Sequence, residues 1–118
     1  VFGGRGDNSG MKARGLAVDS MEDVYLVGYA SVALDNSVHL GETDAFLMQL
    51  DGNTGASLWT RQFGTIGYDR AFGIAIDPNR PDMTIYVAGE TVGSMDGKTN
   101  LGGYDAFLVR YDQFGKRL

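Results

Sequence analysis

The sequence has 118 residues, of which 43% are hydrophobic and 21% are charged, and its formal net charge is −5. This composition is typical of one globular domain and excludes an intrinsically disordered chain. A duplex nucleic-acid binder is expected to carry a basic face, and a membrane-spanning helix needs a run of about 20 apolar residues. Neither feature is present in the sequence, so we expect no nucleic-acid partner and no membrane span in this segment. The absence of cysteine excludes disulfides and thiol chemistry.

Seven short runs rich in Val, Ile, Leu, Tyr and Phe follow one another along the chain, each bounded by turn residues. None of them shows the period of an amphipathic helix. We therefore expect an all-β protein. The predicted strands cover residues 14–20, 23–30, 44–50, 57–63, 70–77, 84–91 and 105–111.

Two of the intervening segments, 51–55 and 112–115, have the composition of hairpin turns. The first begins with Asp51 and has a superficial likeness to a calcium-binding loop. An EF-hand loop, however, needs glycine at its sixth position and glutamate at its twelfth, which are here Ala56 and Gln62. We therefore predict a hairpin turn in preference to a calcium loop.

The chain repeats itself at a spacing of 61 residues, because Asp-Ala-Phe-Leu at 44–47 returns at 105–108. A second block, at 15–19, returns at 73–77 with a spacing of 58 residues. The three residues of difference lie in the segments between strands, where insertions are tolerated. The chain is therefore predicted to contain two copies of one structural unit.

Both faces of the repeated strand are apolar. Ala45 and Leu47 point to one side of a strand that begins at residue 44, and Phe46 and Met48 point to the other. A sheet with one solvated face would alternate apolar and polar residues, whereas a sheet covered on both faces would not. Four-stranded antiparallel sheets that are repeated and covered on both faces are the blades of a β-propeller. We expect a single segment of this kind over residues 1–118, with blade-like repeats at about 1–61 and 62–118.

Several segments carry a resemblance to a known family. "DAFLVRYDQFGKRL", "LWTRQFGTIGYDRAFGIAIDP" and "IYVAGET" resemble the repeats of seven-bladed bacterial-type propellers, often called SBBP repeats. The resemblance covers nearly the whole chain twice and implies a propeller scaffold without an activity. "LDGNTGASLW" is similar to quinoprotein-type propeller repeats, although the second copy lacks its Thr-Gly.

Both ends of the sequence match one kind of strand. Residues 1–3 match the end of the strand at 57–63, and residues 116–118 match its beginning. Two blades cannot close a ring that needs typically 4–8. We therefore expect a segment of a larger propeller, in preference to a self-associating unit. Other blades of the same or neighbouring chains are then its first partners.

The two long connections between strands, at 30–43 and 91–104, are predicted to form one rim of the ring and its contact surface. The rim residues that we expect to contact a ligand are Asp35, Asn36, His39, Glu42, Asp96, Lys98, Asn100 and Tyr104.

Some carboxylates recur in both copies, as Asp19 does at Asp77 and Asp35 at Asp96. They could cap turns or bind an ion such as calcium, and a structural role is favoured because every copy repeats them. We otherwise expect no cofactor and no catalytic group. Trp59 is expected to pack in the core or between blades in preference to forming a stacking platform.

Two functions remain open at this point. The first is a non-catalytic binding or scaffold module of an extracellular or cell-surface propeller, which recognises a protein or a glycan. The alternative is a fragment of a propeller enzyme, quinoprotein-like or a hydrolase or lyase, with its active site in the central channel.

Overall fold

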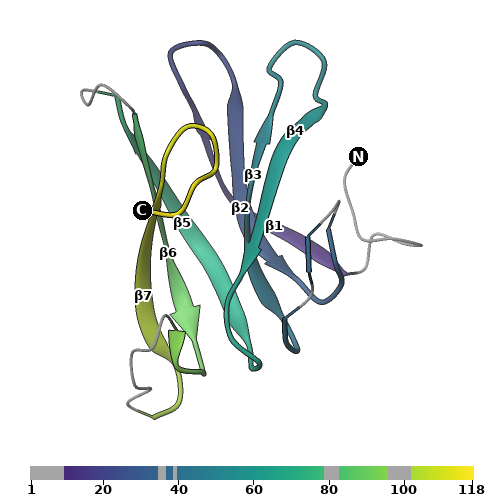
Figure 1. Ribbon diagram of the computed structural model, residues 1–118, viewed down its shortest axis with the longest axis vertical. Helices are drawn as coiled ribbons and strands as arrows, with labels where there is room; N and C mark the ends of the chain where they lie inside the picture. Colours follow the sequence, from purple (N-terminus) through teal and green to yellow (C-terminus); the bar gives the residue numbers. More distant parts are fainter. Residues whose placement is uncertain (1–9, 35–36, 39, 79–82, 96–101) are drawn as a thin grey trace.

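The computed structural model describes residues 10–34, 37–38, 40–78, 83–95 and 102–118. These residues form seven β-strands in two antiparallel sheets, and no α-helix is found among them (Figure 1). The strands are β1 (Met11–Val18), β2 (Val24–Ala30), β3 (Asp44–Leu50), β4 (Ser57–Phe63), β5 (Asp69–Asp77), β6 (Thr84–Thr91) and β7 (Asp105–Tyr111).

The two sheets differ in their number of strands. Sheet 1 has the order β1-β2-β3-β4 and sheet 2 the order β5-β6-β7, so the expectation of two four-stranded sheets holds for the first only. The repeat explains the difference, because the counterpart of Ser57, where β4 begins, is Leu118, the last residue of the printed sequence. Beyond β7, an isolated antiparallel bridge joins Arg117 to Tyr111, and the Leu118 amide donates to the Arg110 carbonyl.

The first strand begins and ends earlier than predicted, at Met11 and Val18. Asp19 is the reason for the early end. Its carboxylate accepts hydrogen bonds from the backbone N–H groups of Met21 and Asp23, which fold the chain into a turn directly after the strand.

The backbone repeats as the sequence does. Pairing of β1 with β2 shifts register between Ala13 and Gly15, and pairing of β5 with β6 shifts between Ala71 and Gly73. These positions correspond at the spacing of 58 residues. Both sheets therefore carry a β-bulge at the same place in the pairing of their first two strands.

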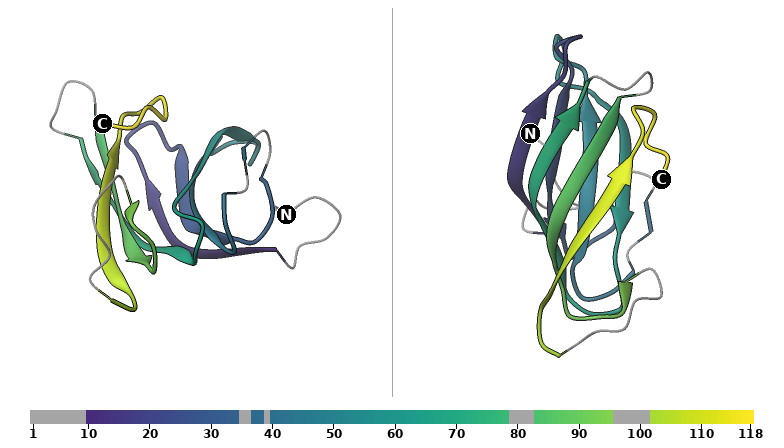
Figure 2. Two further views of the ribbon diagram at one scale, coloured as in Figure 1. Left: turned by 60° about the horizontal axis from the view of Figure 1, so that its bottom comes forward. Right: turned by 90° about the vertical axis from the view of Figure 1, so that its left-hand side faces the viewer.

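One face of sheet 1 packs against one face of sheet 2. Strand β5 contacts β1, β2 and β3, and Figures 1 and 2 show β5 between β7 and sheet 1. The two sheets come close at Gly15, where an added Cβ would lie 3.0 Å from the Phe72 carbonyl oxygen. The buried core between the sheets consists of Tyr25, Val27, Ala45, Leu47, Phe63, Ala71, Ile85, Val87, Met95, Val109 and Tyr111.

The far face of sheet 1 is buried by a second cluster. Phe46 and Met48 of β3 lie there with Leu34 of the β2–β3 connection. Both faces of β3 are therefore covered, as its sequence predicts.

The far face of sheet 2 is open. Leu108 is 65% exposed, whereas its repeat counterpart Leu47 is fully buried. We call this surface the open face of sheet 2. Its apolar and aromatic residues are Ala75, Tyr86, Ala88, Ala106 and Leu108, which are exposed or half-buried, and Glu90 and Arg110 lie on the same face.

The turn after β7 packs on the outer strand of sheet 1. Arg61 Nε donates a 2.7 Å hydrogen bond to the Gly115 carbonyl, and Trp59 Nε1 donates one of 3.3 Å to the Gln113 carbonyl. Trp59 also packs against Tyr25, with ring centroids 6.2 Å apart. Trp59 thus contributes to packing between the two repeats, as predicted.

Candidate functional site

The long connections leave both sheets at the same end of the molecule, shown at the bottom of Figure 1. Of the eight predicted contact residues, the structure describes Glu42 and Tyr104. The others lie outside the described residues: Asp35, Asn36, His39, Asp96, Lys98 and Asn100. Glu42 and Tyr104 are both exposed, and each lies beside a side chain of one larger group.

That group is centred on the Arg70 guanidinium, at the start of β5. Its central carbon lies 5.3 Å from the ring centroid of Tyr29, 5.8 Å from that of Tyr68 and 5.7 Å from that of Tyr104. A cation within about 6 Å of an aromatic ring is attracted by the quadrupole of the ring. Three rings from different parts of the chain therefore hold one guanidinium in place.

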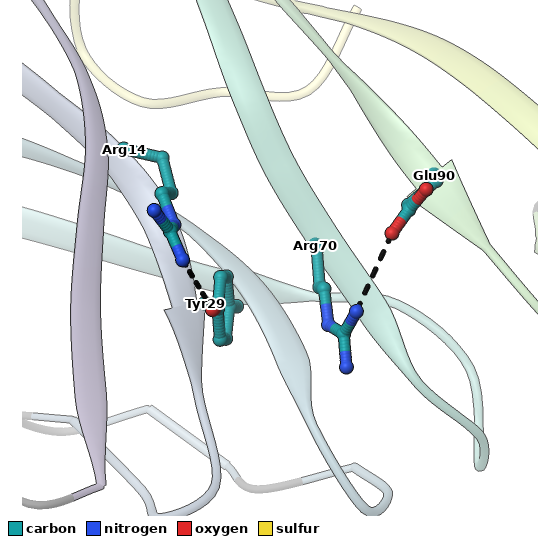
Figure 3. Close-up of polar contacts among 4 residues, drawn as sticks. All are labelled: Arg14, Tyr29, Arg70 and Glu90. Atoms are coloured by element: carbon teal, nitrogen blue, oxygen red, sulfur yellow. Dashed lines mark hydrogen bonds and ion pairs between the residues drawn. The ribbon is translucent and has the colours of Figure 1, made fainter.

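A second guanidinium belongs to the same group. Arg14 Nη2 donates a 2.9 Å hydrogen bond to the Tyr29 hydroxyl, and its guanidinium lies 5.5 Å from the ring centroid (Figure 3). Tyr29 therefore contacts one arginine from each sheet. We call Arg14, Tyr29, Tyr68, Arg70 and Tyr104 the Arg70 cluster.

Among the described residues, the ion pair of Arg70 is with Glu90 of β6, which lies next to the cluster. Nη1 lies 3.5 Å from Oε1 of Glu90, and both side chains are about one-third exposed (Figure 3). Arg70 Nε is buried and has no hydrogen-bond partner among the described residues. Within the described part of the chain, this guanidinium therefore makes one long side-chain hydrogen bond, to Glu90.

The pKa values of two tyrosines in the cluster reflect the charges around them. The hydrogen bond from Arg14, followed by the charges of Arg14, Lys12 and Arg70, lowers the pKa of Tyr29. At the other side of the cluster, the hydrogen bond to Glu42 and its negative charge raise the pKa of Tyr68. The potential is thus positive beside Tyr29 and more negative toward Glu42.

A turn between the two sheets positions Tyr68. Thr65 donates from its backbone N–H to Asp69 Oδ2 at 2.6 Å, and the Gly67 N–H donates to the Thr65 hydroxyl. Asp69 itself donates its backbone N–H to the carbonyl of Thr43, the residue directly before β3. These bonds fix Tyr68 and Arg70 beside the first residues of β3.

Four members of the cluster were not predicted from the sequence, because three lie in strands and one lies in a short turn. A signal for them was present in the repeat. Tyr29 corresponds to Glu90 and Arg14 to Phe72, so the two copies differ in chemistry at these positions, whereas the neighbouring Gly28 recurs as Gly89. A ligand site needs one asymmetric set of groups, and positions where the copies differ are where such a set arises.

The carboxylates of the turns have structural partners. Asp51 Oδ1 accepts from the N–H groups of Asn53 and Thr54, which lowers the pKa of Asp51. Asp112 Oδ1 accepts from Phe114 and Lys116 in the matching turn. Within the described part of the chain, no group of three or more His, Cys, Asp or Glu side chains is arranged to hold a metal ion.

A groove of about 810 Å³ runs along β4, away from the Arg70 cluster. Its wall includes Gln62, whose side-chain amide is used internally. Oε1 accepts from the Leu34 N–H, and Nε2 donates to the Val32 carbonyl and to Asp44. The Gln62 amide is therefore not available to a ligand in this groove.

No family model matches the sequence, and no curated protein matches it. In the described residues, no helix is long and apolar enough to cross a membrane.

Proposed function

We propose that the chain forms two neighbouring blades of a larger β-propeller and acts as a non-catalytic binding or scaffold module. The repeated sheets and their matching β-bulges support the blade interpretation. The SBBP-type resemblance in the sequence points the same way.

The open face of sheet 2 supports a further sheet beside it. In sheet 1 the equivalent face carries Ala45 and Leu47, and these side chains are fully buried against sheet 2. Sheet 2 presents Ala106 and Leu108 at the same positions. A surface that needs a covering sheet in one copy therefore needs one in the other, and another blade is the partner that fits it.

Sedimentation velocity of the 118-residue chain and of Leu108→Lys tests this packing. We expect the unchanged chain to self-associate through the open face as its concentration rises, and Leu108→Lys to remain monomeric. Met21→Lys is the control, because Met21 is an exposed side chain in the turn after β1. Equal association of all three proteins, or no association of the unchanged chain, would contradict the proposal.

The Arg70 cluster is the single observation that carries the binding function. It lies at the rim where both long connections leave the sheets, and it joins side chains of both repeats. Tyr68 and Tyr104 are 40% and 50% exposed, so their rings are available to a ligand. A protein or a glycan is the proposed partner, and an extracellular or cell-surface location is proposed with it.

An array of neutral oligosaccharides, acidic oligosaccharides and acidic peptides tests the binding function. We expect the unchanged chain to bind and a Tyr68→Ala, Tyr104→Ala double variant to lose binding. Phe114→Ala removes an exposed ring from the turn after β7 and serves as the control. Binding that is equal in the three proteins would show that the rim is not the recognition surface.

A further inference from the structure

The Arg70 guanidinium is fixed in position but makes few hydrogen bonds to the described residues. Three tyrosine rings surround it, and its hydrogen bond within the described residues is the 3.5 Å contact with Glu90. A guanidinium has five N–H donors in a rigid planar arrangement. Such a group matches the two oxygens of a carboxylate, and pre-positioning lowers the entropic cost of binding one.

The charges at the cluster favour a ligand with few negative charges. Among the described residues, Lys12, Arg14 and Arg70 place their positive charges around Tyr29. The carboxylate of Glu42 lies beside Tyr68, and that of Glu90 lies beside Arg70. Glu42 and Glu90 would repel a dense polyanion, so the positive side of the cluster suits a single carboxylate better.

The exposed tyrosine rings beside Arg70 favour a sugar. A pyranose ring has an apolar face of C–H groups that can lie on an aromatic ring, and its hydroxyls remain in water. Tyr104 is the most exposed of the three rings around Arg70, and its centroid lies 5.7 Å from the guanidinium carbon. A glutamate side chain of a peptide would supply the carboxylate but no flat apolar face, and would lose more rotamer freedom on binding.

We propose that the Arg70 cluster binds a uronic acid residue of an acidic oligosaccharide. The uronate carboxylate accepts hydrogen bonds from Arg70, and the pyranose ring lies against Tyr104. This inference rests on the proposed binding function and names the ligand class of the same site.

Calorimetric titration with digalacturonate and with its dimethyl ester tests the proposal. We expect the acid to bind the unchanged chain about 10- to 100-fold more tightly than the ester, because the ester cannot pair with a guanidinium. Arg70→Gln is expected to weaken binding of the acid by the same factor and to leave the ester unaffected. Arg70→Lys keeps the charge but loses the planar pair of donors. Its affinity for the acid should therefore lie between those of the unchanged chain and of Arg70→Gln.

Arg110→Gln is the matched control, because Arg110 is an exposed arginine on strand β7. It should bind the acid as the unchanged chain does. Thermal unfolding of each variant shows whether it folds. If Arg70→Gln does not fold, the affinities of the unchanged chain for the acid and for the ester decide whether the site recognises a carboxylate.

The outcomes separate this inference from the proposed function. Equal binding of acid and ester overturns the role of Arg70 in carboxylate recognition, while sugar binding at the rim stands. Binding of a pentaglutamate peptide in place of digalacturonate overturns the sugar class and leaves rim recognition intact. If the unchanged chain binds no compound of the array and neither digalacturonate nor its dimethyl ester, both proposals are wrong.

Discussion

Sheets 1 and 2 carry nearly the same strand in two different environments. Leu47 of β3 is fully buried between the sheets, and Leu108, its counterpart in β7, is 65% exposed. Both residues follow the same Asp-Ala-Phe sequence and have the same position in their sheets. Their burial is therefore decided by what covers the sheet, and the strand alone does not determine it.

The largest expected difference is between Leu47→Ala and Leu108→Ala. Removing a fully buried leucine side chain leaves a cavity and costs about 2–5 kcal/mol of unfolding free energy. Removing an exposed one is expected to change it by less than about 0.5 kcal/mol. Urea unfolding of the monomeric chain measures both values. Similar costs for the two variants would mean that Leu108 is also covered in solution.

The second comparison is between Gly15→Ala and Gly73→Ala, which follow the bulges of β1 and β5. A Cβ at Gly15 would lie 2.9 Å from Val27 Cγ2 and 3.0 Å from the Phe72 carbonyl oxygen, so we expect a cost of about 1–3 kcal/mol. A Cβ at Gly73 would meet only Ala88, at 3.9 Å. Gly73→Ala should be neutral or stabilise by about 0.4–1 kcal/mol. The same urea unfolding experiment measures both variants. A Gly15→Ala variant with the same unfolding free energy as the unchanged chain would contradict the close approach of the sheets.

A smaller difference is expected between the two matching turns. Gly55 and Gly115 have φ values of 75° and 83°, so alanine is strained at either position by about 1–2 kcal/mol. Nothing lies within 4 Å of a Cβ at Gly55, whereas one at Gly115 would lie 2.9 Å from Trp59 Cε3. Gly115→Ala should therefore cost about 1 kcal/mol more than Gly55→Ala in thermal unfolding. A change in Trp59 fluorescence should accompany Gly115→Ala and not Gly55→Ala.

The smallest expected effect concerns Tyr25, which is fully buried while its counterpart Tyr86 is half-buried on the open face. Burial, then the hydrogen bond to Asp19, raises the pKa of Tyr25. The raised pKa means that the folded state keeps the phenol protonated when the unfolded state begins to ionise, near pH 10. The stabilisation is full below pH 10 and is lost as pH rises above it.

Tyr25→Phe should therefore lose stability less steeply than the unchanged chain above pH 10. Chemical unfolding at several pH values measures the slopes. Between pH 7 and 9 the two slopes should agree, which is the internal control. Parallel slopes above pH 10 would show that Tyr25 ionises alike in both states.

Most of the strands could be predicted from local composition, and four of them have the predicted bounds. Asp19 was expected to cap a turn, and its carboxylate does accept the N–H groups of Met21 and Asp23. The end of β1 was still misplaced, because the predicted strand ran through Asp19 instead of ending before it. The sequence predicted four strands in each sheet, whereas sheet 2 has three among the described residues. What composition could not give is which apolar face is covered, since that depends on the neighbouring sheet.

The candidate site was predicted only in part. Glu42 and Tyr104 were expected from the length of their connections, and both lie at the Arg70 cluster. The other members include three strand residues, Arg14, Tyr29 and Arg70. A charged or half-buried side chain in a strand ordinarily faces solvent, so local composition offered no reason to select them. Their proximity results from the packing of β5 against β1 and β2, which no local pattern contains.

The contact of the last turn with β4 has a consequence for how the chain folds. Arg61 and Gly115 are 54 residues apart in sequence, so the outer strand gains this support only after the second repeat has formed. Contacts between distant residues slow folding because loop closure precedes them. Amide hydrogen exchange along β4 would then report on the integrity of the second repeat, and the two halves would open together as one cooperative unit.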